Sequence, residues 1–101
     1  MRALVFIRAR QAFPMELGPA MAQGFREWRE RYRDQLKEFA WFTSGNGGCA
    51  IAQVANETEL FQMMVTWPLN AFSDVQTYTL VDGDEALEFW ATMVESRTGG
   101  Q

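Results

Sequence analysis

The chain of 101 residues contains no histidine, one cysteine, one lysine and three prolines. Without histidine, acid–base catalysis near neutral pH would depend on a carboxylate, a tyrosine, Cys49 or Lys37. The missing histidines, together with the lack of acidic residues at ligand spacing, argue against a metal site. A lone cysteine excludes a disulfide within the chain and is typical of a reducing compartment, so we expect a cytoplasmic protein.

Long apolar runs are missing as well. No segment approaches the roughly 20 apolar residues that cross a bilayer, and the opening stretch Met1–Ile7 is too short for a signal peptide. The net charge of −4 argues against nucleic acid as a partner. We therefore expect the protein to bind neither a membrane nor nucleic acid.

Apolar surface is what the chain has in excess. Hydrophobic residues make up 48% of it, and its aromatics include four tryptophans and eight phenylalanines. A domain of this size cannot easily bury so much, which indicates a subunit interface, a ligand pocket, or both. The charges are uneven too: residues 1–50 carry eight bases and five acids, and residues 51–101 carry one base and eight acids. This asymmetry either orients subunits or is ordinary surface variation.

The hydrophobic pattern predicts four strands, two helices between them and a terminal helix. Gly and Asn residues between the second and third strands predict a hairpin, Asn56 and Asp84 are expected helix caps, and Pro68 stops the second helix. The predicted strands span residues 3–9, 39–43, 49–54 and 72–81, and the predicted helices span residues 20–38, 56–66 and 85–95.

This order, β-α-β-β-α-β followed by a helix, predicts an α+β, ferredoxin-like fold with both helices on one face of an antiparallel sheet. We expect one domain over residues 1–101, with a core of residues 1–82 and a helical tail of residues 83–101. The other face of the sheet and the tail, which carries Leu87, Phe89 and Trp90, would need a partner. We therefore expect a homodimer with its sheets packed face to face, or a larger homo-oligomer.

Three segments resemble the second half of muconolactone isomerase-like proteins: Val54-Ala55-Asn56-Glu57-Thr58-Glu59-Leu60, Trp67-Pro68-Leu69 and Phe72-Ser73-Asp74-Val75. The shared features are a capped helix, a Pro-Leu terminator and an aromatic-x-Asp-aliphatic entry to the strand. The first half agrees in element order alone. The resemblance implies a dimeric α+β barrel that works without a cofactor. Muconolactone isomerase shifts a double bond in a lactone by proton transfer, and related barrels include polyketide cyclases and cofactor-independent monooxygenases.

Proton transfer next to a carbonyl needs a base for the carbon-bound proton and a donor for the developing enolate. Asp74 is the candidate base, or else a strand-end residue that bonds to the backbone. Tyr32, on the apolar stripe of the first helix, is the candidate proton donor, or else a core residue with an exposed hydroxyl. Arg8 is the candidate ligand for a carboxylate or enolate, or else a surface or interface arginine.

The substrate is expected to lie between the sheet and the helices. Trp28 and Trp67 are the candidate walls of such a pocket, although aromatic residues at helical spacing also form plain cores. Gln53 and Thr43 are candidate polar groups on adjacent strands, and the alternation does not say which face they take. Cys49 is interpreted as a structural small residue because no histidine is present to activate it.

The sequence thus predicts a cofactor-independent isomerase or cyclase that acts by proton transfer on a small apolar carbonyl compound, such as a lactone or a polyketide intermediate. One alternative is a cofactorless monooxygenase of the same barrel type. The other is a ligand-binding or assembly subunit without catalytic activity, whose excess aromatics serve an interface.

Overall fold

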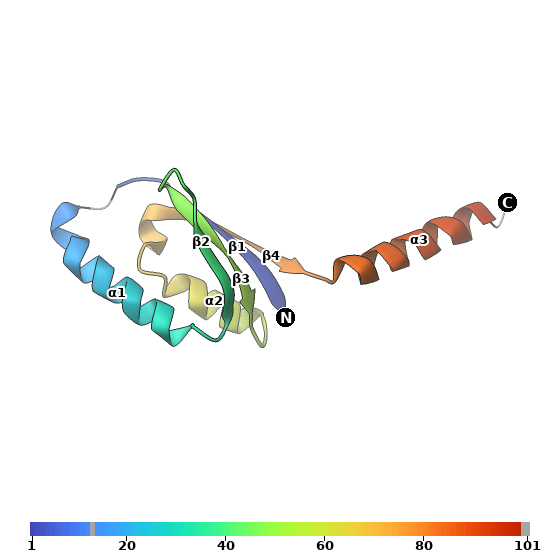
Figure 1. Cartoon of the computed structure of the whole chain (residues 1–101), viewed down its shortest axis with the longest axis horizontal. Coiled ribbons are helices and arrows are strands. Elements are labelled where there is room, and N and C mark those ends of the chain that lie inside the picture. Colours follow the sequence, from blue (N-terminus) through green and yellow to red (C-terminus); the bar gives the residue numbers. More distant parts are fainter. Residues whose placement is uncertain (13, 100–101) are drawn as a thin grey trace.

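The computed structural model describes residues 1–12 and 14–99 (Figure 1). Its elements follow the predicted order. They are β1 (Arg2–Ala9), η1 (Met15–Leu17), α1 (Gly18–Arg31), β2 (Leu36–Trp41), β3 (Gly47–Gln53), α2 (Glu57–Val65), η2 (Asn70–Phe72), β4 (Ser73–Leu80) and α3 (Gly83–Gly99).

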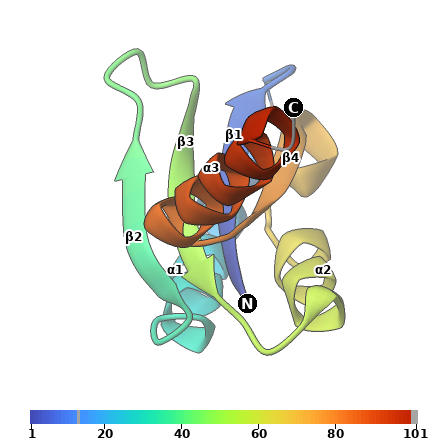
Figure 2. The ribbon, with the colours of Figure 1, turned by 90° about the vertical axis from the view of Figure 1, so that its right-hand side faces the viewer.

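The four strands form one antiparallel sheet in the order β2-β3-β1-β4 (Figure 2). The central strand β1 pairs with β3 on one side and β4 on the other, so Val5 lies opposite both Ala50 and Thr77. Helices α1 and α2 lie on one face of the sheet (Figure 1). This arrangement confirms the predicted α+β, ferredoxin-like fold.

We call the side of the sheet that carries α1 and α2 the inner face. Small and β-branched residues of β1 and β3 fill it, and Ala3, Val5 and Ala52 are at most 1% exposed. Their short side chains leave room for larger groups from the helices, among them Met63 of α2, which is fully buried. The main core therefore lies between the inner face and the two helices.

Helix α1 is shorter than predicted. The periodicity predicted a helix to residue 38, but α1 ends at Arg31 and the chain turns before β2 begins at Leu36. A register shift in the pairing of β2 with β3 lies between Leu36 and Glu38. Because this bulge adds a residue to the strand, Leu36 and Phe39 both face the core although they are three residues apart. Buried residues three positions apart are also typical of a helix, which explains why the predicted helix extended to residue 38.

Helix α2 forms as its capping signal predicts. Asn56 is the N-cap, and its Oδ1 accepts a hydrogen bond from the backbone N–H of Glu59 at 2.9 Å. The helix ends at Val65, before Trp67 and Pro68. A short 3-10 turn, η2, then leads into β4, so the strand begins at Ser73 rather than at the predicted residue 72.

Helix α3 departs most from a compact fold. It runs from Gly83 to Gly99, longer than the predicted residues 85–95, and projects away from the rest of the chain (Figure 1). The predicted cap, Asp84, is wrong: Asp82 Oδ2 accepts a hydrogen bond from the N–H of Glu85 at 3.0 Å. The radius of gyration is 18.2 Å and the longest extent 68 Å, whereas a compact chain of about 100 residues has a radius near 13 Å.

Candidate functional site

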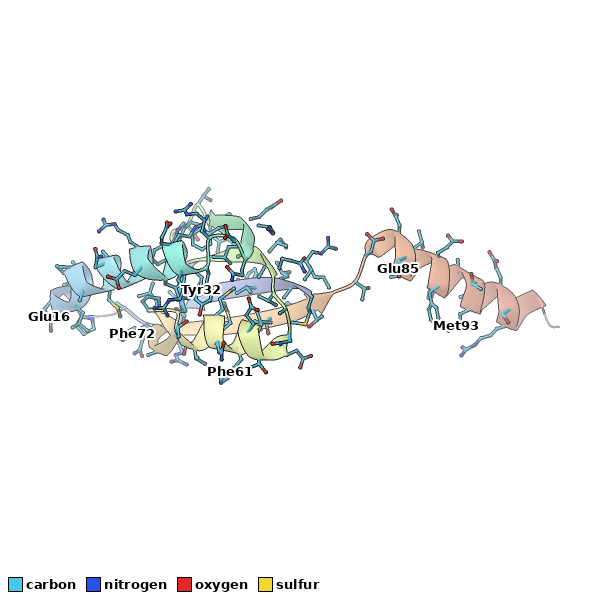
Figure 3. All side chains as sticks on the ribbon, turned by 90° about the horizontal axis from the view of Figure 1, so that it is seen from below. Glu16, Tyr32, Phe61, Phe72, Glu85 and Met93 are labelled. Carbon is cyan, nitrogen blue, oxygen red and sulfur yellow. The ribbon has the colours of Figure 1, made fainter. Side chains whose placement is uncertain are left out.

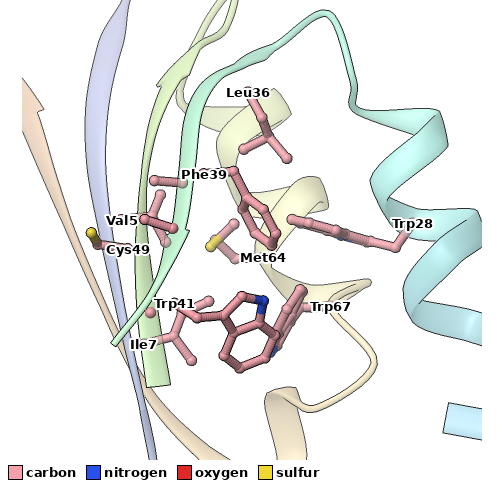
Figure 4. Close-up of a pocket in the computed structure, with 12 residues that line it drawn as sticks. Val5, Ile7, Trp28, Leu36, Phe39, Trp41, Cys49, Met64 and Trp67 are labelled. Carbon is pink, nitrogen blue, oxygen red and sulfur yellow. The ribbon is translucent and has the colours of Figure 1, made fainter. Parts of the chain in front are cut away.

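A narrow apolar cavity lies between the inner face and the helices (Figure 4). Its volume is about 20 Å³, which is room for little more than one water molecule. Trp41 and Trp67 lie near Ile7 at one end of it, and Leu36 and Phe39 lie at the other (Figure 4). Trp28 of α1 and Met64 of α2 complete the walls on the helix side.

A wider opening of about 270 Å³ continues from this cavity. The two spaces share Ile7, Trp41 and Trp67 as lining residues. The opening also has polar lining residues, which are Gln11, Asn46 and Ser73. We call the two connected spaces the tryptophan cavity: a deep apolar end joined to a mouth with neutral polar groups.

Aromatic contacts fix the walls of the tryptophan cavity. The ring of Trp67 meets that of Trp28 edge to face, with centroids 4.6 Å apart, and that of Phe25 in the same way at 4.8 Å. Trp28 is held further because its Nε1–H donates to the backbone carbonyl of Met63 at 2.9 Å. The end of α2 and Pro68 set the position of Trp67, so the wall is built from both helices.

The indole N–H of Trp67 is buried and has no hydrogen-bond partner among the described residues. Leaving a buried donor unsatisfied costs about 1–3 kcal/mol, and buried polar groups in native proteins are almost always paired. Trp28, the neighbouring tryptophan, is paired. The Trp67 N–H, together with one guanidinium nitrogen of Arg29, is thus a buried donor that the described residues leave without an acceptor.

Glycines let β3 lie close to its neighbours at the mouth. A Cβ at Gly47 would collide with the carbonyl oxygen of Ile7, and one at Gly48 would collide with that of Ala40. A side chain at either position would therefore push β3 away from β1 or β2. Both glycines also line the tryptophan cavity, Gly47 at the mouth and Gly48 at the deep end.

The structure places the predicted wall residues Trp28 and Trp67 in the lining of the cavity. Tyr32 lies elsewhere. Its ring packs against Trp28 with centroids 5.5 Å apart, and its hydroxyl lies 3.4 Å from Thr66 Oγ1, between the two helices. Tyr32 is not among the lining residues of the tryptophan cavity.

Arg8 and Asp74 lie on the opposite side of the sheet, which we call the outer face. They are direct cross-strand neighbours, and with Phe6 and Gln76 they line a hollow of about 340 Å³. The guanidinium of Arg8 is 5.6 Å from the centre of the Phe6 ring, and Asp74 forms an exposed ion pair with Arg10 at 3.6 Å. Successive strand residues point to opposite faces, which separates Arg8 and Asp74 from Tyr32 and from the cavity.

The two predicted polar binding residues are also outside the cavity. Gln53 is exposed and alternates with the buried Ala52, so its side chain takes the outer face. Thr43 is exposed in the turn between β2 and β3. The expected single site between sheet and helices is therefore not assembled from the predicted polar groups, whose catalytic and binding roles stay predictions.

Sequence reasoning selected Trp28 and Trp67 alone from this lining, and it missed both the third tryptophan, Trp41, and the polar residues of the mouth, Gln11, Asn46 and Ser73. Trp41 follows the alternation of β2, on the same face as Phe39, and that signal was available. Gln11 and Ser73 are far apart in sequence and meet because Ala9 pairs with Ser73 where β1 and β4 join. No local pattern predicts such a meeting.

Carboxylates and cations are absent from this lining. Among the described residues, no Asp, Glu, Lys, Arg or Tyr lines the tryptophan cavity. Over residues 1–12 and 14–99, no group of three or more His, Cys, Asp or Glu side chains is placed to hold a metal ion. In the same ranges, no helix has the length and apolarity needed to cross a membrane.

No family model matches the sequence, and no curated protein does. Solved structures match it in fold. Muconolactone isomerase superposes with a TM-score of 0.71 over 81% of this chain and 90% of that chain, at 13% identity. The 5-chloro-2-hydroxyhydroquinone dehydrochlorinase of Burkholderia phenoliruptrix, in complex with 2,5-dihydroxybenzoquinone, superposes with a TM-score of 0.66 over 84% and 98%, at 9% identity. The predicted muconolactone isomerase-like fold is confirmed.

Proposed function

We propose that the protein binds a small apolar carbonyl compound in the tryptophan cavity and isomerises or cyclises it by proton transfer, without a cofactor. The observation that carries the proposal is the buried, unpartnered N–H of Trp67 beside an apolar cavity. Two proteins of the same fold support it, one an isomerase and the other a dehydrochlorinase in complex with a quinone.

In this proposal the Trp67 N–H donates a hydrogen bond to the carbonyl oxygen of the substrate. When a proton leaves the neighbouring carbon, negative charge develops on that oxygen, and a preorganised donor in an apolar site stabilises it. The apolar walls make the hydrogen bond stronger than it would be in water. Trp67 thus acts where charge appears in the transition state.

The lining also restricts the substrate. With no carboxylate in the cavity, the substrate itself must carry an acidic C–H, as β-dicarbonyl compounds and enol lactones do. Its proton would pass to water at the mouth, where Gln11, Asn46 and Ser73 offer hydrogen bonds. The same water would return a proton to another carbon of the enolate, which restores the neutral compound with its double bond shifted. The deep end is too small for a whole substrate. An apolar edge of the substrate therefore enters the deep end, and the rest of the substrate lies in the mouth.

A second arrangement uses the outer hollow. Arg8 and Asp74 provide there the cation and the carboxylate that the sequence predicts for an enolate and its base. Asp74 has an exposed side chain, so a second copy would have to cover the hollow before it excluded water. The sheet separates this hollow from Trp67. The first arrangement therefore predicts that substitution of Trp67 lowers activity, and the second predicts that substitution of Asp74 does.

Activity of two single variants tests the proposal. Enol lactones and β-dicarbonyl compounds are screened by ultraviolet absorbance for isomerisation or cyclisation. Trp67→Phe should lower kcat by about 10²–10³-fold, the usual loss on removing one oxyanion donor, whereas Asp74→Asn should change it less than threefold. Trp90→Phe, which removes a tryptophan far from the cavity, is the matched control.

Circular dichroism must show that each variant is folded. Full activity in Trp67→Phe would overturn the assignment of the cavity, and loss in Asp74→Asn alone would move the chemistry to the outer hollow. The same lack of ionisable lining residues favours one other function, ligand binding without catalysis. Saturable binding of these compounds without turnover would identify it, and oxygen consumption would identify a cofactorless monooxygenase.

A further inference from the structure

Helix α3, which we call the arm, has an apolar face that the described chain leaves uncovered. Leu87, Phe89 and Trp90 are 58%, 74% and 57% exposed. At 3.6 residues per turn these side chains share one broad side of the helix with Ala86 and Met93. The arm's acidic residues, including Glu88 and Glu95, lie on the other side. A helix with this division normally packs its apolar side against another surface.

A second uncovered surface lies between α2 and β4. It is a groove of about 420 Å³. Two apolar residues of α2 border it one helical turn apart, Phe61 and Val65, which are 66% and 50% exposed. Thr77 and Thr79 form its floor with Val75. Figure 3 shows Phe61 on the side of α2 that faces away from the domain.

The groove lies over a part of the inner face that no helix of the described chain covers. Thr77 and Thr79 are on the inner face, since they pair with Val5 and Ala3, yet both are exposed. Their partners on β1 are at most 1% exposed because helices cover them. β-Branched side chains make a surface suited to a packed helix. A third helix laid beside α2 would bury the inner face of β4.

The arm cannot readily fill the groove of its own chain. Strand β4 ends at Leu80 and α3 begins at Gly83, so Val81 and Asp82 alone join them. Two hydrogen bonds fix Asp82 to the start of the helix. Its side chain accepts one from the backbone N–H of Glu85, and its backbone carbonyl accepts the other from the N–H of Ala86. The helix continues outward from the end of the strand, with Met93 far from the domain (Figure 3).

We propose that the arm of one copy docks in the α2–β4 groove of a second copy, and that the exchange is reciprocal. A two-fold exchange is closed, so it gives a dimer rather than a fibre. The apolar residues of the arm then meet Phe61 and Val65, with the acidic side toward water. This is recognition of an amphipathic helix by an apolar groove, with this chain providing both partners.

The size of the contact fits a stable dimer. Aromatic side chains bury roughly 150–250 Å² each, so covering the exposed parts of Phe89 and Trp90 removes on the order of 200–300 Å² per arm. With two arms and two grooves the total is on the order of 1,000 Å², and Leu87 and Met93 add to it. Specific interfaces begin near that area.

Complementation between two full-length variants tests the exchange. Trp90→Glu damages the arm and leaves the groove intact, and Val65→Lys does the reverse. Sedimentation equilibrium should show a wild-type dimer at micromolar concentration. Each variant alone should dissociate about 10³-fold more readily, because its dimer loses both contacts and each central contact accounts for roughly 30-fold. An equimolar mixture should dimerise again, because a mixed dimer has one intact contact and one Glu–Lys pair.

Thr92→Glu, on the acidic side of the arm, is the matched control and should dimerise like the wild type. A wild-type monomer would overturn the proposal, and so would a dimer that neither variant weakens, which would place the interface on the outer face. Weakening without rescue on mixing would show the arm docked in its own groove. Both substituted side chains are at least half exposed, so the fold does not depend on them.

A disulfide test reads out the proximity of two positions, at a protein concentration high enough to offset the loss of the Val65 and Trp90 side chains. In a Cys49→Ser background, Val65→Cys with Trp90→Cys should oxidise to a covalent dimer on a non-reducing gel. Val65→Cys with Thr92→Cys should give little of it. A disulfide-linked monomer would place the arm in its own groove, and equal yields from the two pairs would show that the arm has no preferred side, overturning the proposal.

Discussion

The two faces of the sheet differ although they share the same strands. On β1, Ala3 and Val5 point to the inner face and are at most 1% exposed, while Leu4 and Phe6 point to the outer face and are half-buried. Helices of the same chain cover the inner face over β1 and β3 and leave it open over β4. The outer face carries an aromatic contact between Phe6 and Phe42 at 5.1 Å and also two charged cross-strand neighbours, Arg8 and Asp74.

The difference in exposure between the two faces shows which apolar surface a single chain can bury by itself. The inner face holds the core and the tryptophan cavity, where the N–H of Trp67 has no partner among the described residues. The outer face mixes half-buried apolar side chains with exposed charged ones, which is typical of a surface completed by another molecule. The predicted homodimer would cover it, and that stays a prediction.

Trp28→Ala should give the largest effect and break the inner face. The change removes a side chain that is 4% exposed, and the carbonyl of Met63 loses the indole donor and keeps the longer bond from the Thr66 hydroxyl. Large-to-small changes of this kind cost about 3–5 kcal/mol. Urea denaturation followed by circular dichroism measures the free energy of unfolding. A loss below about 1 kcal/mol would show that the cavity walls are not part of the core.

Val5→Thr and Leu4→Thr form a matched pair that compares the two faces directly. At the inner position the new hydroxyl is buried among apolar groups, which costs about 1–3 kcal/mol. At the outer position the hydroxyl can reach water, so the loss should be about 1 kcal/mol or less. Equal losses would mean that the outer face is as well covered as the inner one, as in a tight dimer. Dilution of the sample, which dissociates a dimer, should then make the two losses differ.

Gly24→Ala should have the smallest effect and be stabilising. Gly24 lies within α1, and a Cβ there would meet Pro68 Cγ at 3.6 Å, an ordinary contact distance. Alanine is favoured over glycine inside a helix by about 1 kcal/mol, so thermal denaturation should show a higher midpoint. A lower midpoint would show that α1 and the segment after α2 have no room for one methyl group.

The sequence predicts the fold well because its strongest signals are local. Asn56 before an apolar helix, Pro68 after it and the glycine turn between two strands each act within a few residues. The error in α1 has a physical cause, since the bulge in β2 gives Leu36 and Phe39 a helical spacing. The cap at Asp82 was missed because Asp84, two residues on, offers the same chemistry.

The site was predicted less well because it depends on which face each residue takes. Arg8, Tyr32 and Asp74 have suitable chemistry, but strand alternation places Arg8 and Asp74 on the outer face, while helix packing places Tyr32 between the two helices. The mouth of the cavity requires the ends of β1 and β4 to meet, which is a property of the sheet. Trp67 was selected as a wall, and its missing hydrogen bond becomes visible when the whole surrounding structure is known.

The distribution of the four tryptophans has a spectroscopic consequence. Trp28, Trp41 and Trp67 line the tryptophan cavity, and Trp90 is on the arm. Intrinsic fluorescence therefore has two independent origins in this protein. In a Trp90→Phe variant the emission reports on the cavity alone. The difference from the wild-type spectrum isolates Trp90, whose emission should shift to the blue if a second chain covers it, so one optical signal can follow ligand binding and assembly separately.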